Sequence, residues 1–166
     1  MRLLRHLFAP AVEPLFPAAA LDRIAARIAQ GEATHRGEVC FAVEGALPLR
    51  AVMRGCEARE RAQDVFARLR VWDTEANNGV LLYLLLADHR IEIVADRGFR
   101  GRVGADDWRA VCARMEARLR DGADAAAMEA AVVEALEAMS ALVAAHFPRA
   151  PGEGDANELP DRPRVL

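Results

Sequence analysis

The sequence contains no lysine and only one serine. All 22 basic residues are arginine, which next to abundant alanine is typical of genomic base composition and carries no functional information. The lone serine, Ser140, lies within a helical pattern and lacks the G-x-S-x-G context of an exposed nucleophile. Nucleophilic catalysis by serine is therefore poorly supported.

Cysteine is also scarce, and its spacing suits neither a disulfide framework nor a zinc site. The three cysteines, Cys40, Cys56 and Cys112, are odd in number and form no C-x-x-C pair, so we expect a reducing compartment. Cys112 and Arg118 match the C-x₅-R spacing of cysteine phosphatases, but that chemistry requires a glycine-rich loop around the phosphate. Cys112 instead belongs to an apolar helical stripe, which indicates a core position.

Long apolar runs are absent as well. The longest run, from Val80 to Ala87, is far shorter than a membrane span. At the N-terminus, polar residues and prolines interrupt the apolar residues, so no signal peptide is expected. We therefore predict a cytoplasmic protein without a membrane-spanning segment.

The composition predicts one folded domain. Apolar residues make up 53% and charged residues 28% of the 166 residues, which supports a sizeable core and argues against general disorder. The net charge of -3 gives no reason to expect a nucleic-acid partner. We predict an N-terminal extension over residues 1–16, the folded domain over 17–148, and a disordered tail, rich in proline, glycine and acidic residues, over 149–166.

Apolar periodicity predicts the element order α-β-α-β-β-α-α. The predicted elements are a helix over 17–31, a strand over 38–44, a helix over 57–70, strands over 80–86 and 90–97, a helix that begins at Asp106 or Asp107 and ends at Gly122, and a last helix after Asp124. Residues 47–55 fit either a strand or a short helix. A right-handed crossover makes the first two strands parallel, and the third strand folds back antiparallel. The predicted fold class is α/β, a three-layer α/β/α sandwich with a small mixed sheet covered by helices.

The predicted hairpin brings two polar loops together. With a tight turn at Asp88 and His89, Gly79 faces Gly98. Directly paired residues lie roughly 4.5–5.5 Å apart, so the loop before the second strand meets the loop after the third. The open end of the hairpin is therefore the predicted functional site.

Two sets of side chains gather at this open end. Carboxylate and amide oxygens suit a hard cation such as Ca²⁺ or Mg²⁺, and guanidinium groups suit a phosphate. The spacing Asp73-x-Glu75-x-Asn77 resembles the start of an EF-hand loop, but the glycine and the glutamate that such a loop requires are missing. A purely structural interpretation, with turn residues and a helix cap, stays open, and no organic cofactor is predicted. The candidate metal ligands are Asp73, Asn77, Asn78, Asp96 and Asp106, and the candidate phosphate-binding residues are Arg97, Arg100 and Arg102.

Two stretches carry a family likeness. "VFARLRVWDTEANNGVLLYLLLADHRIEIVADRGF" and "DDWRAVCARMEARLRDG" resemble the TPM domain, and the likeness extends over roughly residues 17–148. The resemblance implies an α/β/α sandwich with a mixed sheet, and calcium binding at the loops that close one end of the sheet. Among the candidate ligands it covers Asn77, Asn78 and Asp96; the other two come from the hairpin geometry alone.

The resemblance implies two divergent functions. Some TPM relatives are described as acid phosphatases, and others as accessory proteins of membrane complexes. Most relatives carry a signal peptide or a membrane anchor, and we expect neither here. We favour a non-enzymatic accessory protein that serves a membrane-linked partner and binds a divalent cation. The alternatives are a metal-assisted acid phosphatase acting on phosphomonoesters and a domain that binds neither metal nor phosphate.

Overall fold

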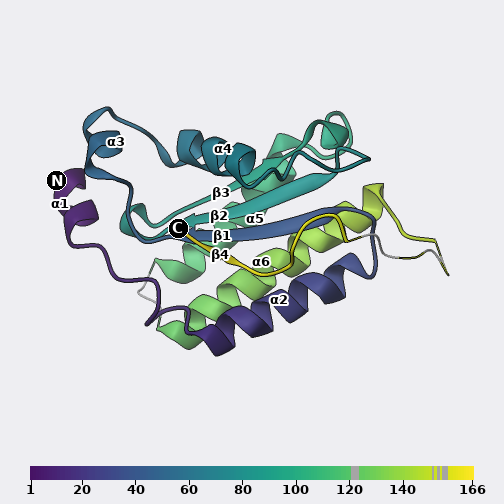
Figure 1. Cartoon of the computed structure of the whole chain (residues 1–166), viewed down its shortest axis with the longest axis horizontal. Helices are drawn as coiled ribbons and strands as arrows, with labels where there is room; N and C mark the ends of the chain where they lie inside the picture. The colour runs from purple at the N-terminus through teal and green to yellow at the C-terminus, as the bar shows by residue number, and fades with distance from the viewer. Residues whose placement is uncertain (121–123, 151, 153, 155–156) are drawn as a thin grey trace.

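The centre of the fold is a four-stranded mixed sheet. The computed structural model describes residues 1–120, 124–150, 152, 154 and 157–166. Its strands are β1 (Glu38–Glu44), β2 (Gly79–Leu85), β3 (Arg90–Ala95) and β4 (Arg164–Val165), in the order β3-β2-β1-β4. β1 pairs in parallel with both β2 and β4, and β2 pairs antiparallel with β3 (Figure 1). The predicted parallel crossover followed by an antiparallel hairpin is confirmed.

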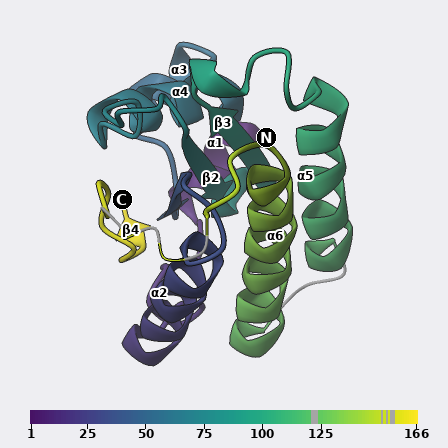
Figure 2. The same cartoon turned by 90° about the vertical axis from the view of Figure 1, so that its right-hand side faces the viewer.

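Helices cover both faces of this sheet. They are α1 (Arg2–Leu7), α2 (Ala18–Glu32), α3 (Leu49–Met53), α4 (Ala58–Arg68), α5 (Ala105–Leu119) and α6 (Ala125–His146), with short 3-10 turns η1 (Leu86–Asp88) and η2 (Arg97–Phe99). α2, α5 and α6 lie on one face, and α3 and α4 lie on the other (Figure 2). The three-layer α/β/α sandwich is therefore confirmed. Among the described residues, no helix has both the length and the apolar character that crossing a bilayer demands.

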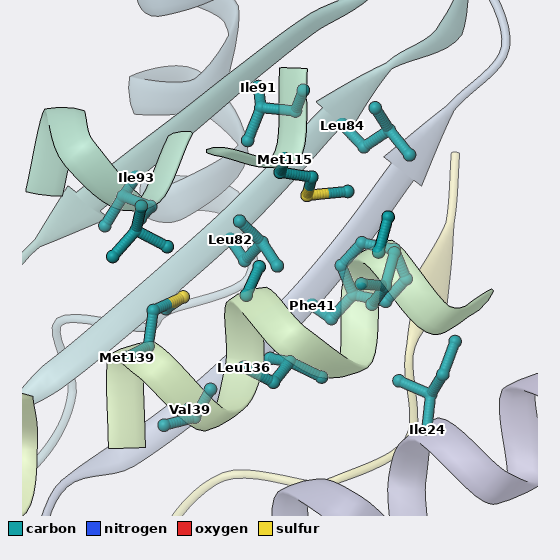
Figure 3. Close-up of a cluster of buried hydrophobic side chains, with 14 of the residues drawn as sticks. Ile24, Val39, Phe41, Leu82, Leu84, Ile91, Ile93, Met115, Leu136 and Met139 are labelled. Atoms are coloured by element: carbon teal, nitrogen blue, oxygen red, sulfur yellow. The ribbon is translucent and has the colours of Figure 1, made fainter. Parts of the chain in front are cut away.

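The two central strands are buried along their whole length, because helices cover both faces of the parallel pair. Alternate residues of β2 divide between two cores. Leu82 and Leu84 belong to the core covered by α2, α5 and α6, which also contains Met115 and Met139 (Figure 3). Leu81 and Tyr83 face α4. The sheet is thus a rigid support for the loops at both of its ends.

A glycine allows two helices on one face to approach closely. Gly31, the predicted end of its helix, lies within α2, which continues to Glu32. A Cβ at Gly31 would overlap the Ser140 hydroxyl of α6. The predicted helix end is corrected by one residue, and the only serine of the chain lies at a helix–helix contact.

The hairpin register differs from the predicted one by two residues. Gly79 pairs with Asp96, whose N–H donates to the Gly79 carbonyl (2.9 Å), and not with Gly98. The chain does not reverse over two residues. It forms η1 and then turns at His89, whose backbone is left-handed with φ 50°. Because the shift is even, every side chain keeps its predicted face, and the two polar loops still meet.

The N-terminal segment, residues 1–16, packs onto the domain. α1 contacts α3 and η1. The His6 side chain is buried, and its Nδ1 accepts a hydrogen bond from the Leu47 N–H (3.1 Å). Phe16 is buried against Phe41 of β1. The extension is therefore part of the packed structure.

The C-terminal segment differs from the predicted disordered tail. β4 pairs with β1, and the Leu159 N–H donates to the Glu38 carboxylate (3.1 Å). The reason is backbone pairing, since the β1 edge offers N–H and C=O groups that β4 satisfies. The proline, glycine and acidic residues that predict a disordered tail give no information on whether its backbone pairs with a strand. Residues 151, 153, 155 and 156 lie outside the described residues, as does Gly122, the predicted end of the helix that contains α5.

Candidate functional site

The open end of the β2–β3 hairpin is formed by the loop before β2 and the turn after β3. The Gly98 N–H donates to the Asn77 carbonyl (2.9 Å). A Cβ at Gly98 would overlap that carbonyl and would also crowd the Ala76 carbonyl. Glycine is therefore required at position 98 for the two loops to touch.

Asn77 links the two loops through its side chain as well. Its backbone is left-handed, with φ 53°, a conformation that asparagine tolerates better than most residues. Its Oδ1 accepts a hydrogen bond from the Nε of Arg97 (2.6 Å). One predicted metal ligand and one predicted phosphate-binding residue thus bind each other.

Asn78 is the most buried of the candidate ligands, with 1% of its surface exposed. Its N–H donates to the Thr74 hydroxyl (3.0 Å), and its Nδ2 donates to the Arg36 carbonyl (2.7 Å). Because a carbonyl must receive a donor, the second bond fixes the orientation of the amide. The Oδ1 of Asn78 is buried, and no described residue donates to it.

Asp96 is the second candidate ligand with an unsatisfied oxygen. Its Oδ1 accepts a hydrogen bond from the Arg97 N–H (2.7 Å) at the start of η2. Its Oδ2 is buried, and no described residue donates to it or forms an ion pair with the carboxylate. A buried acceptor without a donor costs about 1–3 kcal/mol, so this oxygen marks a place where a ligand would be stabilising.

The two unsatisfied oxygens belong to neighbouring positions on different faces. Asp96 pairs with Gly79 and continues the alternation of Val94, which packs toward α4. Asn78 continues the alternation of Val80, which packs toward α6. Both oxygens are acceptors, which fits a cation and not an anion. Asp96, which carries the charge, is the principal candidate ligand.

The remaining two candidate ligands bind arginines within their own segments. Asp73 accepts a hydrogen bond from Arg70 (2.6 Å). Asp106 pairs with Arg109 one turn along α5, and its side chain is 91% exposed. The predicted N-cap of this helix, Asp106 or Asp107, is corrected to Gly104, which precedes α5. Asp107 lies in the first turn, and its carboxylate accepts a hydrogen bond from the Gly104 N–H (3.0 Å). Within the described residues, no group of three or more His, Cys, Asp or Glu side chains is arranged to hold a metal ion.

The three candidate phosphate-binding arginines have separate surroundings. Arg97 binds Asn77, as described above. Arg102 donates to the His146 carbonyl at the end of α6 (3.2 Å) and lies over the Phe147 ring, 4.8 Å from its centroid. This arginine therefore interacts favourably with the negative end of the α6 dipole. Arg100 is exposed at the end of η2.

A buried polar network on the sheet was not predicted from the sequence. Tyr83 donates to Glu44 (2.6 Å), and Arg61 of α4 donates two hydrogen bonds to the same carboxylate (2.8 Å each). Burial, followed by the Glu44 carboxylate, raises the pKa of Tyr83. The network is enclosed between α4 and the sheet, so it fastens the helix and offers no open site. Its sequence signal is weak: the lone tyrosine within a run of leucines.

Cys112 lines a cavity of about 300 Å³ beside β3, together with Arg59, Glu92 and Trp108. Burial raises the pKa of the Cys112 thiol to about 12. The thiol stays protonated at neutral pH, and only the thiolate is a strong nucleophile. The C-x₅-R spacing therefore marks a half-buried helix position, in agreement with the sequence interpretation.

The fold and the open hairpin end define a class of small α/β/α sandwich domains with a mixed sheet. Residues 12–139 match the TPM domain, a segment that includes β1, β2, β3 and the helices that pack on them. The chain belongs to the TPM domain family.

One solved structure shares the fold over nearly the whole chain. It is the NMR structure of the BA42 protein from the psychrophilic bacterium Bizionia argentinensis, with a TM-score of 0.76 and 24% sequence identity over 94% of this chain and 99% of that one. At this identity, the likeness establishes the fold and nothing further. No curated protein matches the chain in sequence.

Proposed function

We propose that this TPM domain is a non-enzymatic accessory module that binds one divalent cation, Ca²⁺ or Mg²⁺, at the open end of the β2–β3 hairpin. The observation that carries the proposal is the buried Oδ2 of Asp96, which no described residue satisfies. A hard cation prefers carboxylate, amide and main-chain oxygens. The Oδ1 of Asn77 already accepts a hydrogen bond from Arg97, and Asn78 continues the other face of the sheet, so Asp96 is the one side chain on which the proposal rests.

The charge of the site predicts weak binding. Asp96 is one carboxylate, and the other predicted ligands in the two loops, Asn77 and Asn78, are neutral. Affinity for calcium increases with the number of charged ligands, and sites with few of them have dissociation constants on the order of 10⁻⁴–10⁻³ M. We therefore expect a site that responds to cation concentration and does not retain a permanent structural ion.

The accessory role rests on the chemistry of the same site. Arg97 and Arg102 bind atoms of this chain, and the thiol of Cys112 is held in its protonated form. Hydrolysis of a phosphomonoester needs an activated nucleophile or a metal-bound water, together with positive groups on the phosphate. A module that changes the geometry of its two loops on binding a cation, and so presents them to a membrane-linked partner, needs neither.

Thermal unfolding with and without the cation tests the proposal. At ten times the dissociation constant, a ligand of the folded state adds about 1.4 kcal/mol to the free energy of unfolding. For a chain of this size, that corresponds to a rise in Tm of about 3–5 °C. We expect this rise with CaCl₂ or MgCl₂ relative to EDTA, and we expect Asp96→Asn to abolish it.

Two controls separate the site from general salt effects. Asp22→Asn removes the same charge from an exposed position on α2, and its rise in Tm should match that of the wild type. Asp73→Asn and Asp106→Asn should retain most of the rise, because both aspartates already pair with arginines. An equal rise in Asp96→Asn would place the cation elsewhere. Cation-dependent hydrolysis of a generic phosphomonoester that Asp96→Asn abolishes would replace the accessory role with a phosphatase.

A further inference from the structure

The end of the molecule that carries the hairpin turn has an exposed apolar surface. Seven of the ten large hydrophobic side chains that are exposed among the described residues lie on α1, α3 and the residues next to α1. Phe8 is 77% exposed and Met53 is 78% exposed. We call this the α1–α3 surface, and its members are Met1, Leu3, Leu4, Leu7, Phe8, Leu49 and Met53.

The two helices that form this surface are fixed to the domain and to each other. α1 contacts both α3 and η1, and the two helices lie at the same end of the molecule (Figure 1). Arg2 donates two hydrogen bonds to Asp88 (2.9 and 2.7 Å), and His6 accepts one from Leu47 (3.1 Å). The side of α1 that faces the domain is therefore polar and bonded, while its leucines point away from it. An apolar surface held in this way is a feature of the fold and not of a loose terminus.

Basic side chains accompany the apolar ones. Arg5 is exposed on α1, Arg50 is exposed on α3, and Arg54 is exposed directly after α3. Arg5 lies 3.4 Å from the Asp88 carboxylate, and neither Arg50 nor Arg54 forms an ion pair with any described residue. The whole chain carries a net charge of -3, so the two arginines without an ion pair, Arg50 and Arg54, give this surface a local positive charge.

We propose that the α1–α3 surface docks on a lipid bilayer that contains anionic lipids. Apolar side chains beside arginine, on short helices that lie on the surface of the protein, are the pattern that inserts shallowly at the headgroup boundary. Each arginine near an anionic membrane surface strengthens the attachment. Arg50 and Arg54 form no ion pair with a described residue, so the surface carries positive charge that anionic headgroups would neutralise.

This docking surface is independent of the proposed cation site. It lies at the turn of the β2–β3 hairpin, and the cation site lies at the opposite, open end. A domain docked through α1 and α3 would therefore present its open end away from the bilayer, accessible to a protein partner. The two proposals can fail separately, because one is measured with vesicles and the other with a cation in the absence of lipid.

Vesicle co-sedimentation tests the docking. The full chain is mixed with vesicles of phosphatidylcholine alone and with vesicles in which about 30% is phosphatidylglycerol. We expect binding to the anionic vesicles only, weakened by salt. Phe8→Ser combined with Met53→Ser should weaken binding about 10-fold or more, since both side chains would lose their burial in the headgroup boundary. Arg50→Gln combined with Arg54→Gln should weaken it about 10-fold.

A matched charge control is available on α5. Arg114→Gln combined with Arg120→Gln also removes two exposed arginines and should leave vesicle binding unchanged. All the substituted side chains are exposed, and circular dichroism and Tm should show unchanged folding. Equal binding to neutral and anionic vesicles, equal loss in the α5 control, or no binding at all would overturn the proposal. So would a concentration-dependent dimer that Phe8→Ser and Met53→Ser abolish, since the surface would then bind a second copy.

Discussion

The two ends of the β2–β3 hairpin each carry a buried aspartate oxygen, and the two aspartates differ in their ion pairs. At the turn, the Asp88 side chain is 7% exposed and faces Arg2 at 2.7 Å and Arg5 at 3.4 Å. At the open end, the Oδ2 of Asp96 is buried, and the carboxylate has no ion pair among the described residues. One oxygen of each carboxylate, Oδ1 of Asp88 and Oδ2 of Asp96, is buried without a hydrogen bond from any described residue. The difference is the ion pairs: positive groups lie next to Asp88, and no described residue forms an ion pair with Asp96.

The difference separates a structural carboxylate from a candidate binding carboxylate. Burial opposes the ionisation of Asp88, but the hydrogen bonds and the charge of Arg2 outweigh it and lower the pKa of Asp88 below its ordinary value. This carboxylate fastens α1 to the hairpin turn. Asp96 receives only the Arg97 N–H, and its second oxygen is available to a ligand.

Glu32 is a third buried carboxyl group, and it differs from both aspartates because its pKa is raised. Its substitution gives the largest change in free energy of unfolding that we predict. Burial, only partly offset by a hydrogen bond from the Val39 N–H, raises the pKa of Glu32 to about 9 from an ordinary value of 4.5. The folded state therefore keeps a proton that the unfolded chain releases. The stabilising contribution of the neutral group is fully present below pH 4.5 and is lost as the pH rises toward 9.

Glu32→Gln removes this dependence, since an amide keeps the acceptor and cannot ionise. Relative to the wild type, the variant should gain about 3 kcal/mol in free energy of unfolding between pH 5.5 and 8, at about 1.36 kcal/mol per pH unit. Urea unfolding at both pH values measures the gain. Glu13→Gln, at an exposed position, is the matched control. Equal pH dependence in the wild type and in Glu32→Gln would mean that Glu32 is ionised in the folded state.

Removing the arginine that holds Asp88 should have the next largest effect. Arg2→Ala takes away two hydrogen bonds and leaves a carboxylate that is 7% exposed with His6 at 3.2 Å and Arg5 at 3.4 Å. Loss of one partner from a partly buried pair destabilises by about 2 kcal/mol. Urea unfolding at pH 7 measures the loss.

The surface pair between Arg23 and Glu129 provides the comparison. Arg23 also makes two hydrogen bonds to a carboxylate (2.7 Å each), but it is largely exposed. Arg23→Ala should therefore destabilise much less than Arg2→Ala. Equal losses would show that burial of Asp88 does not strengthen its pairing, and the contrast between the two hairpin ends would disappear.

The fold could be predicted because its signals are local and periodic. Residues 38–44 alternate apolar and other side chains, and β1 has those bounds. The unbroken apolar run from Val80 required cover on both faces, which the helices provide. Together with the rule for crossover connections, these two strands were enough to predict the sandwich.

The details of the site depend on features that no local pattern encodes. The register shifted by two residues because η1 and the left-handed His89 lengthen the turn, and no glycine marks that position. The pairing of β4 with β1 is a backbone interaction between segments more than a hundred residues apart. Whether a candidate aspartate ligand is available to a cation depends on its ion pairs. Asp73 and Asp106 each pair with an arginine three residues away, whereas Asp96 has no such pair among the described residues.

Aspartate-to-asparagine substitutions at the two hairpin ends should change the free energy of unfolding by different amounts in the absence of metal. This expected difference is smaller than the effects of Glu32→Gln and Arg2→Ala. Asp88→Asn leaves Arg2 without its carboxylate, but Arg2 is 23% exposed and can reach water. We expect a loss of about 1 kcal/mol in free energy of unfolding. Asp96→Asn keeps an oxygen for the Arg97 N–H and removes a charge that nothing in the described chain balances, so its effect should lie within about 0.5 kcal/mol of zero.

Urea unfolding in EDTA at pH 7 measures both variants, and EDTA is essential because a bound cation would add its own stabilisation to the wild type. A loss in Asp96→Asn as large as that in Asp88→Asn would mean that the chain itself satisfies the Asp96 carboxylate. The open end would then be structural in the same sense as the turn. A neutral or stabilising effect of Asp96→Asn would mean that the carboxylate contributes nothing to the stability of the metal-free fold. Its buried oxygen would then be available to a ligand, as the proposed cation site requires.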